Sequence, residues 1–192
     1  MCSSDLVHLE ERTPERVWEM VSRGRLSVGL TRPVAAHESL GLPCLPLRKE
    51  RFCAALPAQH IWAGRPKLLW KQLAQEPIIM LARREGVSSH DAILAACLRA
   101  GFTPRIVHNP SLIGTVLRYV EAGAGIGIVP EGVDSERSGC ATELIPLSPV
   151  QTIPLIMVWN REAEDPASVG FRELMQTWQS TGKLFPLPLS SR

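Results

Sequence analysis

An arginine stands at the end of one predicted strand, where it could bind an acidic ligand. Arg32 follows a strand predicted over residues 26–30 and precedes Pro33. A guanidinium group presents a planar fork of N–H donors, which can hold a carboxylate through two parallel hydrogen bonds. Ligands of open α/β sheets bind beyond the carboxyl ends of the strands, so this position suits a binding site. An ordinary surface arginine is the alternative that this segment alone leaves open.

Two strand-to-helix turns farther along the chain carry basic, hydroxyl and amide groups. The first contains Arg83, Ser88 and Ser89. The free backbone N–H groups at a helix start, together with two hydroxyl groups, form a site for an anion, although the hydroxyls can instead simply cap the helix. The second turn contains Asn109 and Ser111, and Ser111 is expected to begin a helix. We expect these five side chains to line a ligand site.

The sequence contains no side-chain set with the spacing of a catalytic or metal site. The Gly-x-Ser-x-Gly pattern of a hydrolase nucleophile is absent, and no pair of carboxylates stands out. The five histidines stand singly, without a partner at metal-ligand spacing. They are His8, His37, His60, His90 and His108. This pattern favours a binding protein over an enzyme and predicts no metal ion.

The glycine-rich segment 121–127 (EAGAGIG) resembles a nucleotide-binding loop only in composition. A dinucleotide fingerprint follows a strand and begins a helix, so that the helix N-terminus meets the pyrophosphate. Here a predicted helix ends and a strand begins. Gly123 is therefore interpreted as the residue that ends the helix, and Gly125 and Gly127 as small residues in a closely packed strand. We expect no cofactor.

Composition limits the class of protein. The 192 residues suffice for one large domain or two small lobes, and 45% of them are hydrophobic. The net charge of +2 and the lack of clustered Lys and Arg argue against direct nucleic-acid binding. No signal peptide and no segment long enough to span a bilayer are visible, which predicts a cytoplasmic protein that does not contact the membrane.

The cysteines do not suggest a disulfide framework. There are five of them, an odd number, and no pair has C-x2-C spacing. We interpret them as small buried or indifferent residues in a reducing cytoplasm, and redox sensing as the less favoured alternative.

Strand and helix patterns alternate along the chain, which indicates βαβ units and largely parallel sheets. Thr13 is expected to cap the first helix, with Pro14 in its first position. A helix from Ser88 or Ser89 to Arg99 and another beginning at Ser111 follow in the second half. Strands are expected over residues 7–10, 26–30, 45–47, 52–56, 78–81, 105–108, 126–129, 144–147 and 153–159, and further helices over 68–73 and 167–180.

Five segments, in their order and spacing, resemble the effector-binding domain of LysR-type transcriptional regulators. They are 11–14 (ERTP) with 23–30 (RGRLSVGL), 52–60 (FCAALPAQH), 101–107 (GFTPRIV) and 120–130 (VEAGAGIGIVP). The resemblance runs from about residue 7 to residue 171. It implies an α/β fold of two flavodoxin-like lobes, similar to periplasmic binding proteins of type 2, joined by two crossover strands. Lobe one would comprise 1–52 and 147–192, and lobe two 53–146.

The resemblance also implies where the effector contacts fall. They are expected on Thr13, on Arg32 and on the loops around Arg83 and Asn109. The first strand and helix of lobe one, with a further hydroxyl contact, would lie upstream of this sequence, as would the helix-turn-helix head. Binding of DNA would then occur only through that missing head.

The function implied is regulation of transcription. A small organic acid between the lobes would shift lobe closure and the arrangement of a homodimer or tetramer of the full-length regulator. A solute-binding protein of a transport system is a rival with the same lobes, but it would need export. A small α/β enzyme is a second rival, which would need a catalytic set.

Overall fold

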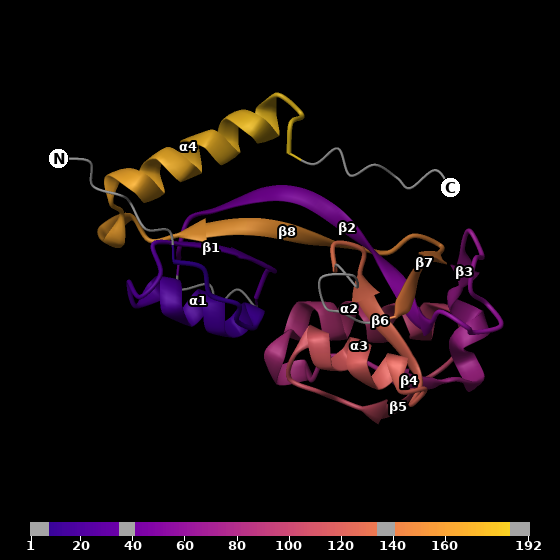
Figure 1. Ribbon diagram of the computed structural model, residues 1–192. Coiled ribbons are helices and arrows are strands. Elements are labelled where there is room, and N and C mark those ends of the chain that lie inside the picture. The colour runs from indigo at the N-terminus through magenta and orange to yellow at the C-terminus, as the bar shows by residue number, and fades with distance from the viewer. Residues whose placement is uncertain (1–7, 35–40, 134–140, 185–192) are drawn as a thin grey trace.

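The computed structural model describes residues 8–34, 41–133 and 141–184, which form two lobes (Figure 1). Strand β2 (Cys44–Pro57) runs through both lobes. It pairs with β8 (Thr152–Trp159) as far as Arg51 and with β6 (Ile126–Pro130) from Phe52 onward. The two-lobed α/β fold expected from the sequence is thus confirmed. The exact lobe boundaries, 1–52 with 147–192 and 53–146, remain a prediction.

Lobe one, in the part of the chain described, is an antiparallel sheet between two helices. Its strands are β1 (Val28–Thr31), β8 and the first half of β2. Helix α1 (Pro14–Ser22) packs Val17, Trp18 and Val21 against Ile156 and Val158 of β8. Helix α4 (Pro166–Ser180) packs Met175 against Met157 and Trp159, which lie on the opposite face. Because side chains alternate along a strand, β8 contributes to both small cores.

Lobe two is a mixed sheet in the order β5-β4-β6-β2-β7-β3. Its parallel part holds β4 (Pro77–Ile79), β5 (Arg105–His108) and β6, while β2 runs antiparallel to β6 and to β7 (Thr142–Ser148). Strand β3 (Leu68–Leu69) lies parallel to β7. Helices α2 (Val87–Arg99) and α3 (Ile113–Glu121) cover opposite faces of this sheet, each over its own buried cluster. Three short 3-10 helices complete the elements: η1 (Trp70–Gln75), η2 (Arg83–Glu85) and η3 (Arg161–Ala163).

Several sequence predictions about the elements were wrong. The two strands expected over 45–47 and 52–56 are one continuous strand, and the sheet of lobe one is antiparallel rather than parallel. Of the strand expected over 7–10, residues 8–10 are not in a strand, and residue 7 lies outside the described residues. Residues 68–73 begin as strand β3 and continue as the 3-10 helix η1, instead of forming one helix.

The helix starts also differ in detail from the prediction. Thr13 is the N-cap residue of α1, as expected, but its side chain makes no capping hydrogen bond. Helix α2 begins at Val87 after Gly86, so neither Ser88 nor Ser89 is its cap. Helix α3 begins at Ile113 rather than at Ser111. The hydroxyl groups at these turns therefore do not cap the helices.

The glycine-rich segment serves backbone packing, as the sequence predicted. Gly123 has a φ of 75° just after α3, where a left-handed residue ends the helix. Gly125 has a φ of 156°, and a Cβ atom there would lie 2.4 Å from the backbone oxygen of Pro77. The segment thus brings β6 tightly against β4. None of the helices in the described residues is long and apolar enough to cross a membrane.

Candidate effector site

A cavity of about 100 Å³ lies between the two lobes. Lobe one contributes Pro14, from the first turn of α1, and Arg32, from the end of β1. The remaining lining comes from β2, the strands and helices of lobe two, and the segment after β6. These residues are Phe52, Met80, Leu81, Ser89, His90, Ile93, Ile113, Ile128, Pro130 and Val133. Nine of the twelve lining residues are apolar, so the few polar groups determine which ligand fits.

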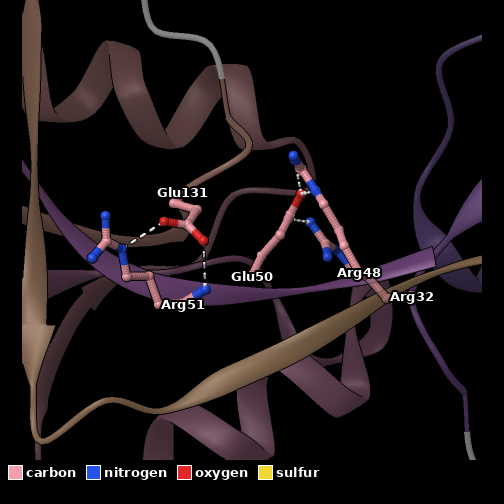
Figure 2. A network of polar contacts seen from close by, with 5 residues as sticks. All are labelled: Arg32, Arg48, Glu50, Arg51 and Glu131. Carbon is pink, nitrogen blue, oxygen red and sulfur yellow. Dashed lines mark hydrogen bonds and ion pairs between the residues drawn. The ribbon is translucent and has the colours of Figure 1, made fainter. Parts of the chain in front are cut away.

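The guanidinium of Arg32 belongs to a charged cluster on β2 (Figure 2). It donates from Nη2 to Oε2 of Glu50, while Arg48 donates to the other oxygen, with its Nε at 2.7 Å. The Glu50 residue is only 1% exposed. The cluster therefore places the cationic group of Arg32 beside the cavity, and a cation there favours a negatively charged ligand.

One nitrogen of Arg32 is left over for such a ligand. Its Nη1 atom is buried and has no hydrogen-bond partner among the described residues. The backbone of Arg32 is held in place because the indole of Trp18 donates to its carbonyl oxygen at 2.9 Å. A buried donor without an acceptor is unfavourable by about 1–3 kcal/mol. An acceptor on a ligand would remove this cost.

A second ion pair lies on β2 next to the first, as Figure 2 shows. Arg51 donates from Nε to Oε2 of Glu131 at 2.6 Å, and their backbones are linked by the Glu131 N–H to the Arg51 oxygen at 2.9 Å. The next residue, Gly132, lies so close that a Cβ atom would be 2.3 Å from Oε1 of Glu50. The segment after β6 is thus packed directly against the charged cluster where β2 passes between the lobes.

Two hydrogen bonds join the start of α2, in lobe two, to residues of lobe one. The carboxylate of Glu15, on α1, accepts a hydrogen bond from the backbone N–H of Val87 at 2.8 Å. The hydroxyl of Ser88 donates to the carbonyl oxygen of Pro33. The helix start that the sequence predicted as an anion site therefore does bind a carboxylate, and this carboxylate belongs to the same chain.

The structure brings only some of the predicted site residues together. Arg32 and Ser89 line the cavity, and Thr13 directly precedes Pro14, which also lines it. Ser88 lies at the interlobe contact described above. The roles of these residues in binding remain predictions.

The other predicted residues lie outside the cavity lining. Arg83 points to Asp91 and holds its carboxylate through two hydrogen bonds of 2.8 Å. These bonds and the charge of Arg83 keep the pKa of Asp91 below its usual range. Asn109 and Ser111 are exposed, and the cavity is lined instead by Ile113, at the start of α3.

The sequence analysis missed His90. It noted this residue as one of five single histidines, whereas the structure places it in the cavity wall with 9% of its surface exposed. Its Nδ1 lies 3.5 Å from Oδ1 of Asp91, yet makes no hydrogen bond. The signal that could have found it is its position three residues before the buried Ile93, on the inner face of the same helix.

No group of three or more His, Cys, Asp or Glu side chains that could hold a metal ion occurs within the residues the structure describes. Arg32 and His90 both line the cavity, and each has one buried nitrogen without a hydrogen-bond partner among the described residues. The two lobes and the cavity between them define a ligand-binding domain of the periplasmic-binding-protein-like type 2 class.

Comparison with known proteins identifies the family. The LysR substrate binding domain family matches residues 6–180, and the chain belongs to this family. Among solved structures, the effector binding domain of QuiR in complex with shikimate has a similar fold, with a TM-score of 0.72 at 15% identity. The match covers 88% of this chain and 79% of that one.

Two curated relatives are transcriptional regulators. The uncharacterized HTH-type transcriptional regulator YwbI of Bacillus subtilis is 29% identical over 152 residues, which cover 77% of this chain and 48% of the relative. The HTH-type transcriptional regulator TtuA of Agrobacterium vitis is 28% identical over 179 residues, covering 90% of this chain and 58% of the relative. The chain thus spans about half the length of the curated relatives it matches.

Proposed function

We propose that this chain binds a small carboxylate in the cavity between its lobes and so regulates transcription as part of a longer LysR-type protein. The observation that carries this proposal is that Arg32, a residue of the cavity wall, has a buried Nη1 atom without a hydrogen-bond partner among the described residues. The co-occurrence of this fold with shikimate in QuiR is consistent with a small organic acid.

The ligand would act by changing how often the lobes are closed. It would contact Arg32 of lobe one together with Ser89 and other groups of lobe two, and it would therefore bind the closed arrangement more tightly than an open one. A ligand shifts such an equilibrium only by its difference in affinity for the two states. In the full-length protein, a homodimer or tetramer would pass this change to helix-turn-helix heads on DNA. On this proposal the chain performs no catalysis of its own.

Thermal-shift screening of organic acids against the purified chain and the full-length protein tests the proposal. An effector at one hundred times its Kd stabilises a protein by about 2.7 kcal/mol, which raises the Tm of a domain of this size by roughly 5–10 °C. We expect Arg32→Ala to abolish this rise. The matched control is Arg99→Ala, which removes an exposed arginine at the end of α2, outside the cavity lining, and should keep the full rise. Equal stabilisation of both variants would remove Arg32 from the site.

A gel-shift assay tests the proposal that DNA is bound by the full-length protein and not by this chain alone. The isolated chain should give no specific complex with promoter DNA, whereas the full-length protein should form one that responds to the acid found by screening. A specific complex with the isolated chain would contradict the proposal.

A further inference from the structure

The cavity contains two polar groups with unused hydrogen-bonding capacity, one from each lobe. The first is Nη1 of Arg32, which can only donate a hydrogen bond. The second is the imidazole of His90, a residue that lines the same cavity and whose Nδ1 has no hydrogen-bond partner among the described residues. A ligand that satisfies both groups would be bound by both lobes at once.

The surroundings of His90 indicate which of its nitrogens is the acceptor. Its Nδ1 lies 3.5 Å from Oδ1 of Asp91, and this carboxylate is fixed in place by two hydrogen bonds from Arg83. The negative charge beside Nδ1 favours the tautomer that carries its proton there. The lone pair of Nε2 then remains as an acceptor, and a ligand must offer it a donor, such as a hydroxyl group.

The size and lining of the cavity restrict the rest of the ligand. An apolar cavity of about 150 Å³ holds one benzene molecule, so a cavity of about 100 Å³ suits a ligand no larger than benzene, with about four to six non-hydrogen atoms. Nine of the twelve lining residues are apolar, which disfavours a ligand with many hydroxyl groups. Arg32 is the one arginine or lysine among the twelve lining residues, which favours a single carboxylate over two.

We infer that the effector is a short-chain hydroxy monocarboxylate whose carboxylate binds Arg32 and whose hydroxyl donates to His90. This inference rests on the proposed function, since it names the ligand class of the same site. His90 is the residue that determines specificity, because it distinguishes a hydroxy acid from the corresponding plain acid. A site that binds a hydroxyl group discriminates against a ligand that lacks it, because its own polar group is then left unpaired.

Isothermal titration calorimetry of the purified chain tests the inference with three acids of the same chain length and a dicarboxylate. The probes are propionate, 2-hydroxypropionate, 3-hydroxypropionate and malonate. We expect at least one hydroxypropionate to bind about ten-fold or more tightly than propionate, and malonate to bind more weakly than that isomer. In His90→Phe this hydroxyl advantage should disappear, while the affinity for propionate stays within about three-fold.

Three further variants make the outcomes distinguishable. His90→Gln, which keeps hydrogen-bonding groups, should retain part of the advantage, and Arg99→Ala, a change at the exposed end of α2, should retain all of it. Arg32→Lys should weaken the binding of every monocarboxylate, because a lysine does not reproduce the guanidinium geometry. If the advantage persists in His90→Phe, if malonate binds most tightly, or if none of the four acids binds, the inference is overturned while the proposed function stands. If Arg32→Lys has no effect on binding, both are overturned.

Discussion

The carboxylate of Glu15 and the backbone N–H of Val87 are joined by a hydrogen bond of 2.8 Å across the two lobes. Glu15 lies in the first turn of α1, and Val87 is the first residue of α2. A helix N-terminus carries partial positive charge and free N–H donors, so a carboxylate from the other lobe is well placed there. Together with the bond from Ser88 to the Pro33 oxygen, this contact holds the lobes in the arrangement described.

Loss of the Glu15 carboxylate should loosen the lobes. In Glu15→Ala the N–H of Val87 loses its acceptor, at a cost of about 1–3 kcal/mol to the closed arrangement. We expect faster hydrogen exchange at the start of α2 by mass spectrometry and a larger radius of gyration by small-angle X-ray scattering. Glu19→Ala is the matched control, because Glu19 lies on the same helix but, among the described residues, pairs with Arg16 and Arg23 of lobe one. If both variants behave alike, the contact does not hold the lobes.

Removal of the buried charge of Glu50 should destabilise the fold strongly. In Glu50→Gln the two guanidinium groups of Arg32 and Arg48 lose their shared counter-charge in a largely buried place. Breaking a buried ion pair from one side costs about 3–5 kcal/mol. Glu131→Gln breaks a more exposed pair, with its side chain 26% exposed, and should cost about 1 kcal/mol or less. Urea unfolding midpoints of the two variants measure the difference, and equal losses would refute the role given to burial.

Two glycine substitutions should have opposite effects on stability. Gly125→Ala puts a Cβ atom 2.4 Å from the backbone oxygen of Pro77, where neither backbone can easily move, so we expect a loss of about 1–3 kcal/mol. Gly170→Ala lies within α4 with no atom within 4 Å of the new Cβ, and should gain about 0.5–1 kcal/mol from the higher helix propensity of alanine. Thermal unfolding would record both signs. A stabilised Gly125→Ala would mean that β6 and β4 are not packed this closely.

Two buried cysteines should resist alkylation. Burial raises the pKa of Cys53 to about 12 and that of Cys97 to about 11, so at pH 8 only about one Cys97 thiol in a thousand is a thiolate. Cys44 is exposed and should react first of these three. Iodoacetamide labelling followed by peptide mass spectrometry measures the rates; labelling of Cys97 should rise as the pH is raised toward 11, and that of Cys53 only at higher pH. Fast labelling of either at pH 8 would show that the site opens to solvent.

Local sequence patterns predicted most helices and strands, but not those that depend on distant partners. Apolar spacing, Pro14 at the start of α1 and the glycine after α3 are local signals, and in the structure α1 begins and α3 ends where these signals place them. The continuous strand β2 was predicted as two strands, because charged residues interrupt its apolar pattern. Those charges are neutralised by Arg32, 18 residues before Glu50, and by Glu131, 80 residues after Arg51. No local pattern reports such pairings.

The candidate site was predictable to a similar extent. Arg32 and Ser89 were found because each lies near the end of a strand or the start of a helix, where ligands commonly bind. The partner of the α2 start, Glu15, lies 72 residues from Val87, and only the folded chain shows that it occupies this place. His90 was overlooked because a single histidine has no recognisable spacing. Only the structure shows that this histidine is buried in the wall of the cavity.

The way β2 is shared between the lobes determines the order in which a growing chain can complete them. The partners of its second half, β6 and β7, end at residues 130 and 148, whereas its first half and β1 depend on β8, which ends at residue 159. A ribosome releases the chain from its N-terminus, so the sheet of lobe two is available for folding before that of lobe one. Until β8 has left the ribosome, β1 and the first half of β2 lack their strand partner. A nascent chain would most need a chaperone during that interval.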